Sequence, residues 1–307
     1  MTMSKPTVHT IITHPGMAHQ DDLLAVSVLL ALYPDATLER RPPTEDELDD
    51  WQVAVVDIGQ QYDPALNNFD HHQWTAGEVC PCSASLVLEH YTGLQRGYHD
   101  GPLYDCFPQL KFVDRLDNHG PKVVAEGYTI PNKVDPKGYA EQVSRITDMV
   151  YDSAPMPTQF LLDAFTRHNH LPWLRPCLTA MGTGLLQKAK AYTKAVERIN
   201  NEPPVMHEIP GRYGCIATYD DELSQVERQA LSQYLDHTYP DGVAVVASHD
   251  DRGPGWSCVQ HNHNKTMDTT KLAKDPRVLF AHKGGFIMKT KEELSIEEVV
   301  DLIREAC

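Results

Sequence analysis

The stretch Phe69-Asp70-His71-His72-Gln73 determines how the rest of this 307-residue chain is interpreted. It comes after Val53–Val56, an apolar run typical of a buried strand, which ends in Asp57. Two adjacent imidazoles on a tight turn point in different directions, so one can bind a metal ion while the other faces a bound ligand. Imidazole is the commonest metal-ligating side chain, and carboxylates beside it suit hard or borderline divalent ions. Taken alone, the stretch is equally consistent with a solvated turn.

A second polar cluster lies near the N-terminus, in Thr13-His14-Pro15-Gly16-Met17-Ala18-His19-Gln20-Asp21-Asp22. It follows a strand expected over residues 8–13 and precedes an apolar helix expected over residues 21–33. Two imidazoles and two carboxylates therefore lie on a strand-to-helix turn. We expect Asp22 to cap the helix and to interact with its dipole rather than to bind metal.

Two more clusters complete the pattern. One is Asp57 at the end of its own strand, and the other is Asp114-Arg115-Leu116-Asp117-Asn118-His119-Gly120 at the end of a helical stretch. In an open parallel sheet the carboxyl ends of the strands share one edge, and ligands bind in the crevice there. All four clusters can converge on that edge, which predicts a metal site for two ions.

Acidic and histidine motifs in this order resemble those of the DHH phosphoesterase superfamily, which includes RecJ-type exonucleases, nano-RNA phosphatases and family II inorganic pyrophosphatases. The sequences that surround these motifs are more similar to one branch of the superfamily, the melanocyte proliferating gene family. That family is associated with 3′-to-5′ RNA exonuclease activity and was long labelled as metal-dependent protein hydrolases. The resemblance continues through Ser83–Val87 and Asp117-Asn118, and it returns near the C-terminus at Phe280–Ile287.

The resemblance implies hydrolysis of a phosphoester at two divalent ions roughly 3.5–4 Å apart, which neutralise the phosphoryl charge and activate water. We expect Asp57 to bridge the two ions, because its place at a central strand end leaves it little freedom. By the superfamily pattern, the first ion is held by His14, His19 and Asp57, and the second by Asp57, Asp21, His71 and Asp117.

Three further side chains have roles around these ligands. His72 is expected to hydrogen-bond the phosphate, and with Asp57 it forms the predicted catalytic pair. Asp70 is expected to fix a histidine tautomer. Asp114 lies one helical turn from Asp117, so the choice between these two as the fourth-motif ligand stays open.

The nature of the metal follows from the ligand set. Many DHH enzymes have aspartate where His19 stands, and a neutral imidazole lowers the anionic ligand count by one. We expect two Mn2+ ions per chain, with Co2+, Zn2+ or Mg2+ as alternatives. Cys80-Pro81-Cys82 has no second closely spaced cysteine pair, so we do not interpret it as a zinc site.

The charge balance bears on partners and location. With 27 basic and 43 acidic residues the formal net charge is −16, which disfavours long-range attraction of a long polyanion. We therefore expect a short single-stranded nucleic acid or nucleotide as substrate. Seven cysteines without a framework, no signal peptide and no membrane-spanning apolar run predict a cytoplasmic protein without a membrane partner. Homo-oligomerisation is left open.

Strands that alternate with helices predict an α/β fold: a doubly wound, mainly parallel sheet domain followed by a second, smaller mixed α/β domain. We expect a DHH-type catalytic domain at 1–177, a helical linker at 178–204 and a C-terminal substrate-binding domain at 205–307. Further expected strands lie at 36–41, 53–57, 213–219, 243–247, 255–259 and 278–282, and further expected helices at 83–90, 103–116, 138–151, 158–169, 222–234 and 296–306.

In the resembled superfamily the second domain binds the substrate. Related phosphoesterases commonly have Gly-Gly-His near the C-terminal motif, whereas here the order is altered and the glycines precede Phe286. Glycines there still allow close backbone approach to an anion. The predicted substrate contacts are His72, His261, His282, Gly284, Gly285 and Lys289.

The sequence therefore predicts a metal-dependent phosphoester hydrolase, preferably a 3′-to-5′ exonuclease on short single-stranded RNA or DNA. The first alternative is a phosphatase or phosphodiesterase of small nucleotides or dinucleotides. The second is a metal- or nucleotide-binding protein without catalysis. A peptidase is disfavoured, because no His-Glu-x-x-His zinc motif is present.

Overall fold

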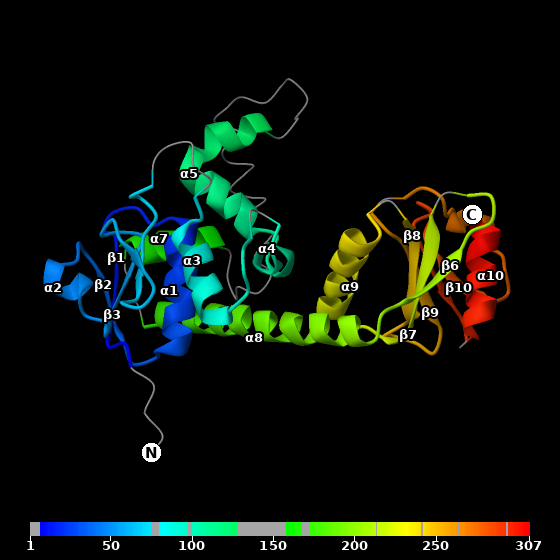
Figure 1. The fold of residues 1–307 in the computed structure, drawn as a ribbon, viewed down its shortest axis with the longest axis horizontal. Helices are drawn as coiled ribbons and strands as arrows, with labels where there is room; N and C mark the ends of the chain where they lie inside the picture. The colour runs from blue at the N-terminus through cyan, green and yellow to red at the C-terminus, as the bar shows by residue number, and fades with distance from the viewer. Residues whose placement is uncertain are drawn as a thin grey trace, which may run out of the picture. The chain divides into compact units, whose positions relative to one another are not determined.

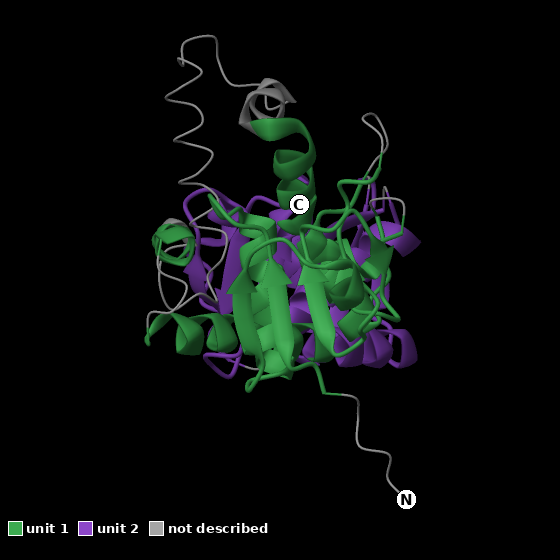
Figure 2. Ribbon diagram, turned by 90° about the vertical axis from the view of Figure 1, so that its left-hand side faces the viewer, with its two compact units in different colours: residues 1–190 green, residues 191–307 purple. Residues whose placement is uncertain are grey.

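A computed structural model of the chain describes residues 7–74, 80–97, 100–127, 158–167, 172–212, 214–240, 242–262, 264–292 and 294–307. The chain divides into two compact units, Met1–Lys190 and Ala191–Cys307 (Figures 1 and 2). The division falls inside helix α8 (Leu174–Asn201), within the segment interpreted above as a linker. Among the described residues, no helix has both the length and the apolar character needed to cross a bilayer.

The first unit is built on a five-stranded sheet in the order β2-β1-β3-β5-β4. Its parallel strands are β1 (Thr10–Thr13), β2 (Thr37–Arg40), β3 (Val53–Val56) and β5 (Asn68–Phe69), and β4 (Tyr62–Asp63) pairs antiparallel with β5. Figure 2 shows the strands side by side. The predicted mainly parallel sheet is confirmed.

Helices lie on both faces of this sheet (Figure 1). Helices α1 (Gln20–Leu32) and α3 (Ser83–Thr92) pack together on one face. On the other face, Leu48 of the short helix α2 (Glu45–Leu48) packs on Ile12, Val53 and Val55. The apolar residues of α1 are buried around most of its circumference, since α1 also packs closely against α8.

The polar clusters predicted from the sequence begin where the parallel strands end. His14 follows β1, Asp57 follows β3, and Asp70 follows β5. Because these strands are parallel neighbours, their carboxyl ends lie on one edge of the sheet. The strand order thus brings three motifs that are distant in sequence to the same edge.

Several elements differ from the sequence-based expectation. The helix expected at 103–116 is two helices, α4 (Pro102–Cys106) and α5 (Leu110–Gly127), and α5 contains a non-helical residue, Gly120, with φ of 73°. The helix expected at 158–169 is α7 (Thr158–Arg167), and the one expected at 138–151 lies outside the described residues. The elements α2, β4 and β5 were not predicted, because each is too short for its periodicity to be recognised.

The second unit contains a six-stranded mixed sheet in the order β10-β11-β9-β8-β7-β6. Only β7 and β8 pair in parallel among its described strands. The strands are β6 (Val205–Glu208), β7 (Cys215–Glu222), β8 (Val243–His249), β9 (Trp256–Gln260), β10 (Val278–Ala281) and β11 (Ile287–Thr290), and the helices are α9 (Gln225–Thr238), the 3-10 helix η1 (Thr269–Leu272) and α10 (Ile296–Ala306). A mixed α/β second unit is as predicted.

The start of α9 corrects the helix expected at 222–234. Glu222 belongs to β7, and the helix begins only after Ser224. The Ser224 hydroxyl accepts a hydrogen bond from the Glu227 backbone N–H, and the Glu227 carboxylate accepts one from the Ser224 N–H. This reciprocal capping box fixes the first turn.

The close contact between α1 and α8 provides a test of the packing in the first unit. A Cβ at Gly182 would lie 1.9 Å from the backbone oxygen of Ser27, so Gly182→Ala should force the helices apart. We expect a loss of about 1–3 kcal/mol in the free energy of unfolding. Denaturant titration measures it, with Gly253→Ala as the control because its added methyl meets open space. Equal midpoints for the two variants would contradict this packing.

Candidate metal centre

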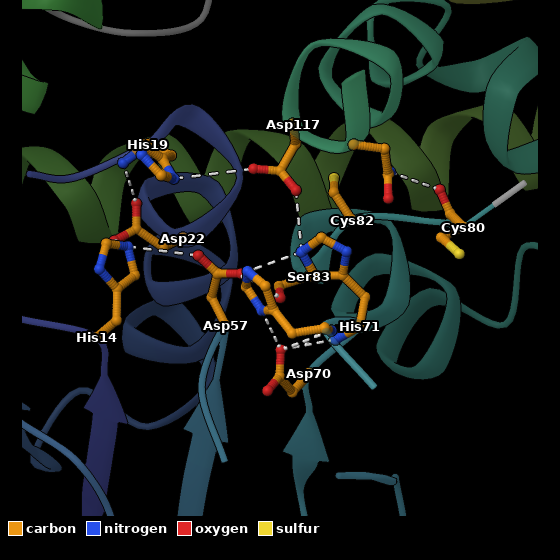
Figure 3. A network of polar contacts seen from close by, with 12 residues as sticks. His14, His19, Asp22, Asp57, Asp70, His71, Cys80, Cys82, Ser83 and Asp117 are labelled. Atoms are coloured by element: carbon orange, nitrogen blue, oxygen red, sulfur yellow. Dashed lines mark hydrogen bonds and ion pairs between the residues drawn. The ribbon is translucent and has the colours of Figure 1, made fainter. Parts of the chain in front are cut away.

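A pocket of about 360 Å³ lies at the carboxyl edge of the parallel sheet. Its side chains come from the ends of β1, β3 and β5 and from the turn that precedes α1, while α5 contributes a further carboxylate (Figure 3). The pocket is lined by His14, His19, Asp57, Ile58, Gly59, Gln60, Asp70 and His72.

The carboxylate of Asp57 lies at the centre of this network (Figure 3). Its Oδ1 is 3.2 Å from Nε2 of His71, and its Oδ2 is 3.4 Å from Nε2 of His14. The Ser83 hydroxyl donates a hydrogen bond of 3.3 Å to Oδ1. One carboxylate oxygen therefore faces each imidazole, which is the arrangement that a bridging ligand requires.

The backbone of Asp57 is also unusual. Its φ of 58° lies in the left-handed region, which costs a residue with a Cβ about 1–2 kcal/mol. The residue is nevertheless held there, because its N–H donates to the Phe69 carbonyl and its side chain is buried. Such strain is common at functional sites, where the surrounding structure maintains it.

The first predicted ligand group, His14, His19 and Asp57, is brought together with its ligand atoms within 4.8 Å of one another. His14 Nδ1 donates a hydrogen bond of 2.9 Å to the Pro15 carbonyl. The lone pair of the neutral imidazole is therefore on Nε2, which points into the site.

The second predicted group also lies together. His19, Asp21 and Asp117 offer ligand atoms within 4.8 Å, so His19 is close to both groups. His71 Nε2 is 2.9 Å from Asp117 Oδ2, and it is the same atom that contacts Asp57. All six predicted ligands thus share one cluster.

His72 is held differently from His71. Its Nδ1 donates a hydrogen bond of 2.7 Å to Asp70 Oδ1, which also accepts the His71 N–H. Burial disfavours the ionised form of Asp70, but hydrogen bonds from His72 and Gln60 outweigh it and hold the pKa of Asp70 below its usual value. Asp70 thus contacts His72, and its expected role in fixing a histidine tautomer stays a prediction. The His72 side chain is 54% exposed, so its ring remains accessible.

The chemistry of the cluster fits divalent cations. Among the described side chains, buried ligand atoms without a hydrogen-bond partner include both Asp21 oxygens and Asp57 Oδ2. Buried carboxylates are costly unless they are paired or coordinate a metal. Two atoms that share an ion at about 2.1 Å lie roughly 3.0–3.4 Å apart. The contacts of Asp57 with His14, at 3.4 Å, and with His71, at 3.2 Å, have this spacing.

Asp22 has a larger role than the sequence suggested. Its Oδ1 accepts the His19 N–H at 2.9 Å, so it does cap α1 as expected. Its Oδ2, however, lies 3.1 Å from His14 Nε2 and 3.8 Å from the Arg40 guanidinium. Arg40 is almost fully buried and stacks on Phe165 with its guanidinium carbon 4.6 Å from the ring centroid. The sequence reasoning missed Arg40, although it ends β2 at the same sheet edge.

The structure separates the roles of Asp114 and Asp117. Asp114 accepts hydrogen bonds from the Cys82 N–H at 2.9 Å, the Ser85 hydroxyl at 2.7 Å and the Tyr104 hydroxyl at 2.6 Å. Its carboxylate is therefore occupied at the start of α3. Asp117 instead faces His71, which makes it the fourth-motif residue of the cluster (Figure 3).

The predicted substrate residues other than His72 lie in the second unit. His261 is buried, with Nε2 2.8 Å from Asp236 Oδ1, and Lys289 Nζ is 2.5 Å from both oxygens of Asp250. The geometry gives no support to substrate contacts by these two side chains. His282 Nδ1 accepts the Gly284 N–H at 3.0 Å, while Gly284 and Gly285 line a separate pocket.

The fold and the cluster define a class, an α/β protein with histidines and aspartates gathered at the carboxyl edge of its parallel sheet. Residues 10–94 match the family model MYG1_exonuc, described as "Uncharacterised protein family (UPF0160)". The chain is also similar to the MYG1 exonuclease of Rattus norvegicus, with 37% identity over 94 residues, 26% of this chain and 24% of that protein. The resemblance expected from the motifs is confirmed, over a match that spans about a quarter of the relative.

Solved structures give a more distant likeness. RecJ from Thermus thermophilus in complex with Mn2+ shows 13% identity and a TM-score of 0.31, covering 97% of this chain and 52% of that one. The same protein in complex with Mg2+ shows 12% identity and a TM-score of 0.31, covering 97% and 49%. The candidate metal centre is therefore inferred from the side-chain geometry described above.

The metal-free cluster should bind protons where ions would otherwise bind. The hydrogen bond and charge of Asp22 raise the pKa of His14 to about 9. Burial lowers the pKa of His71, but its contacts with Asp117 and Asp57 outweigh this and raise it to about 10. Both imidazoles are therefore protonated near neutral pH and must lose a proton before they bind metal.

We accordingly expect metal uptake near neutral pH to release at least two protons per chain, from His14 and His71, with Asp21, whose pKa burial raises, as a further source. Metal affinity should rise with pH. Calorimetric titration of chelated protein with Mn2+, in buffers of different ionisation enthalpy, counts the protons. His14→Ala should release about one fewer, whereas exposed His9→Ala should match the wild type. A binding enthalpy independent of the buffer would contradict this assignment.

A second pair of variants tests the roles of the two α5 carboxylates. Asp117→Asn should weaken metal binding more than about tenfold and leave the stability of the metal-free protein largely intact. Asp114→Asn leaves the hydrogen-bond donors at the start of α3 and the Tyr104 hydroxyl poorly paired, so it should lower the free energy of unfolding by about 1–3 kcal/mol. The number of bound ions should stay normal. Elemental analysis and unfolding curves measure both, and loss of an ion in Asp114→Asn would reverse the assignment.

Proposed function

We propose that this protein is a metal-dependent phosphoester hydrolase, a 3′-to-5′ exonuclease that acts on short single-stranded RNA or DNA. The observation that carries the proposal is the Asp57 carboxylate, with one oxygen toward His14 and the other toward His71. The family match over residues 10–94 supports a nuclease, because this segment includes the first three motifs.

The residues present would hold two divalent ions, Mn2+ being the preferred one. Bound there, the ions would neutralise charge on the phosphoryl group and activate the attacking water. Asp57 would belong to both, which fixes their spacing through one buried carboxylate. The remaining ligands would be His14 and His19 on one side and Asp21, His71 and Asp117 on the other.

His72 is suited to contact the phosphate. Its Nδ1 is occupied by Asp70, so the exposed Nε2 is the atom available to a substrate. The hydrogen bond to Asp70, with the nearby charge of Asp57, raises the pKa of His72 above its ordinary value. A raised pKa favours the imidazolium form, whose Nε2–H can donate to a phosphoryl oxygen.

The acidic charge balance favours short substrates. With a net charge of −16, the protein has little long-range attraction for a long polyanion, so few phosphates should be held beyond the metal centre. The same observation favours a second candidate, hydrolysis of small nucleotides or dinucleotides. Both substrates use the same cluster, and they differ in how many nucleotides are held.

The function is tested with chelated protein reloaded with Mn2+ and a panel of labelled dinucleotides, short and long single strands and duplexes. We expect short strands to be cleaved at least as well as long ones, duplexes to resist, and products to shorten from the 3′ end. Each neutralised phosphate adds about 0.7 to the log–log salt slope of a single strand, so the slope should be shallow. No hydrolysis of any phosphoester would favour a binding protein without catalysis.

His72→Ala in the same assay tests the role of His72. Loss of one hydrogen bond to a charged group costs on the order of 1.5–3 kcal/mol, a roughly ten- to hundredfold fall in rate. The ion count should stay normal, because His72 is not among the proposed ligands, whereas His71→Ala should lose metal. If His72→Ala lost as much metal as His71→Ala, the two histidines would have to exchange roles.

A further inference from the structure

The two carboxylate oxygens of Asp22 have different surroundings. Oδ1 accepts the His19 N–H at 2.9 Å, at the start of α1. Oδ2 lies 3.1 Å from Nε2 of His14 and 3.8 Å from the Arg40 guanidinium. The side chain is fully buried, and Figure 3 shows it beside His14 and His19. One oxygen therefore holds the helix terminus, while the other faces the ligand atom of a proposed metal ligand.

The contact between Asp22 and His14 requires a cation. His14 Nδ1 donates to the Pro15 carbonyl, so the neutral ring has its lone pair on Nε2. In the metal-free protein a proton on Nε2 can join this nitrogen to Asp22, but a histidine that binds a metal ion has lost that proton. Two acceptor atoms only 3.1 Å apart would then face each other without a hydrogen between them. An ion that binds both atoms removes this repulsion.

The distances around His14 suit a shared ion. Two atoms bound to one ion at about 2.1 Å lie roughly 3.0–3.4 Å apart. Asp22 Oδ2 is 3.1 Å and Asp57 Oδ2 is 3.4 Å from His14 Nε2. The position of Asp22 relative to this nitrogen thus matches that of Asp57, which the proposed metal centre already includes.

Arg40 is the competing partner of the Asp22 oxygen. Its guanidinium is held by Phe165, whose carbonyl accepts from Nη1 at 2.9 Å and whose ring centroid is 4.6 Å from the guanidinium carbon. The separation of 3.8 Å between Arg40 and Asp22 is too long for a hydrogen bond. Arg40 therefore supplies an opposite charge to the buried carboxylate and leaves its lone pairs available.

A carboxylate from Asp22 would also balance the two ligand groups. The first ion would otherwise have two neutral imidazoles and Asp57, which it shares with the second ion. The second ion has two carboxylates of its own. Because carboxylates suit Mn2+ and Mg2+, a first group with its own carboxylate fits the same kind of ion as the second.

We propose that Asp22 is a further ligand of the first ion, bound through Oδ2, and that Arg40 balances its charge when the ion is absent. The inference rests on the proposed function, whose metal centre it completes. It assigns Asp22 a role beyond the helix cap expected from the sequence.

Calorimetric titration of the full-length, chelated protein with Mn2+ tests this ligand. Asp22→Asn keeps an oxygen that can accept the His19 N–H but removes the negative charge. We expect it to weaken the first ion at least about tenfold and to leave the second ion bound. Glu298→Gln is the matched control, because Glu298 accepts the Ser295 N–H at the corresponding position of α10. It should bind both ions like the wild type.

Double variants identify the ion that Asp22 binds. If Asp22 and His14 bind the same ion, Asp22→Asn should add little to the loss of affinity in His14→Ala. Combined with Asp117→Asn, it should weaken both ions, because effects at separate sites add. Arg40→Met should keep both ions, since removing a nearby positive charge does not weaken the binding of a cation.

A crystal structure of the wild-type protein loaded with Mn2+ is a second measurement, which needs no variant. Asp22 Oδ2 should lie about 2.2 Å from the first ion. An Asp22 carboxylate that contacts neither ion would overturn the inference, as would normal Mn2+ affinities in Asp22→Asn. In either case Asp22 would serve only the helix cap and Arg40.

The outcomes separate this inference from the proposed function. If Asp22 contacts the first ion but the loaded protein hydrolyses no phosphoester, the hydrolase proposal fails and the ligand assignment stands. If phosphoesters are hydrolysed while Asp22→Asn binds both ions normally, the ligand assignment fails and the function stands. A wild-type protein that binds no ion would contradict both.

Discussion

The structure of the candidate site depends on where Asp57 is held. A residue with a side chain is kept in a left-handed conformation at the end of β3, in the plane of a sheet whose neighbouring strands end beside it. That conformation places its carboxylate between His14, which follows β1, and His71, which follows β5. Parallel pairing thus converts three separate stretches of sequence into one cluster, and the backbone strain at Asp57 is stabilised by the ladder on both sides.

The cluster concentrates negative charge that would be unstable without compensation. Burial and the neighbouring carboxylates of Asp57 and Asp117 raise the pKa of Asp21 well above its usual value. Around it, other polar groups are already paired: Asp70 with backbone N–H groups and His72, and Asp114 with the start of α3. Among the described residues, the buried carboxylate oxygens without a hydrogen-bond partner belong to Asp21, Asp22 and Asp57, where divalent ions would neutralise them.

Most of the site could be predicted because its residues follow apolar runs whose ends must share a sheet edge. The rest depended on contacts that no local pattern contains. Asp114 and Asp117 are one helical turn apart, and only the hydrogen bonds of Asp114 to α3 and Tyr104 separate their roles. Arg40 was missed for a related reason, since its contacts with Asp22 and Phe165 join distant segments. Strand β5, which directly precedes the Asp-His-His motif, consists of Asn68 and Phe69 alone, too short for an alternating pattern.

The central claim is that one carboxylate, Asp57, belongs to two metal ions. Electron paramagnetic resonance of protein loaded with Mn2+ tests it most directly, because two Mn2+ ions that share a bridging carboxylate are magnetically coupled. Elemental analysis of the same samples counts the ions. The account predicts two ions per chain with a coupled spectrum, and loss of both the coupling and at least one ion in Asp57→Asn. A wild-type spectrum of isolated Mn2+ only, or an Asp57→Asn protein with two coupled ions, would contradict it.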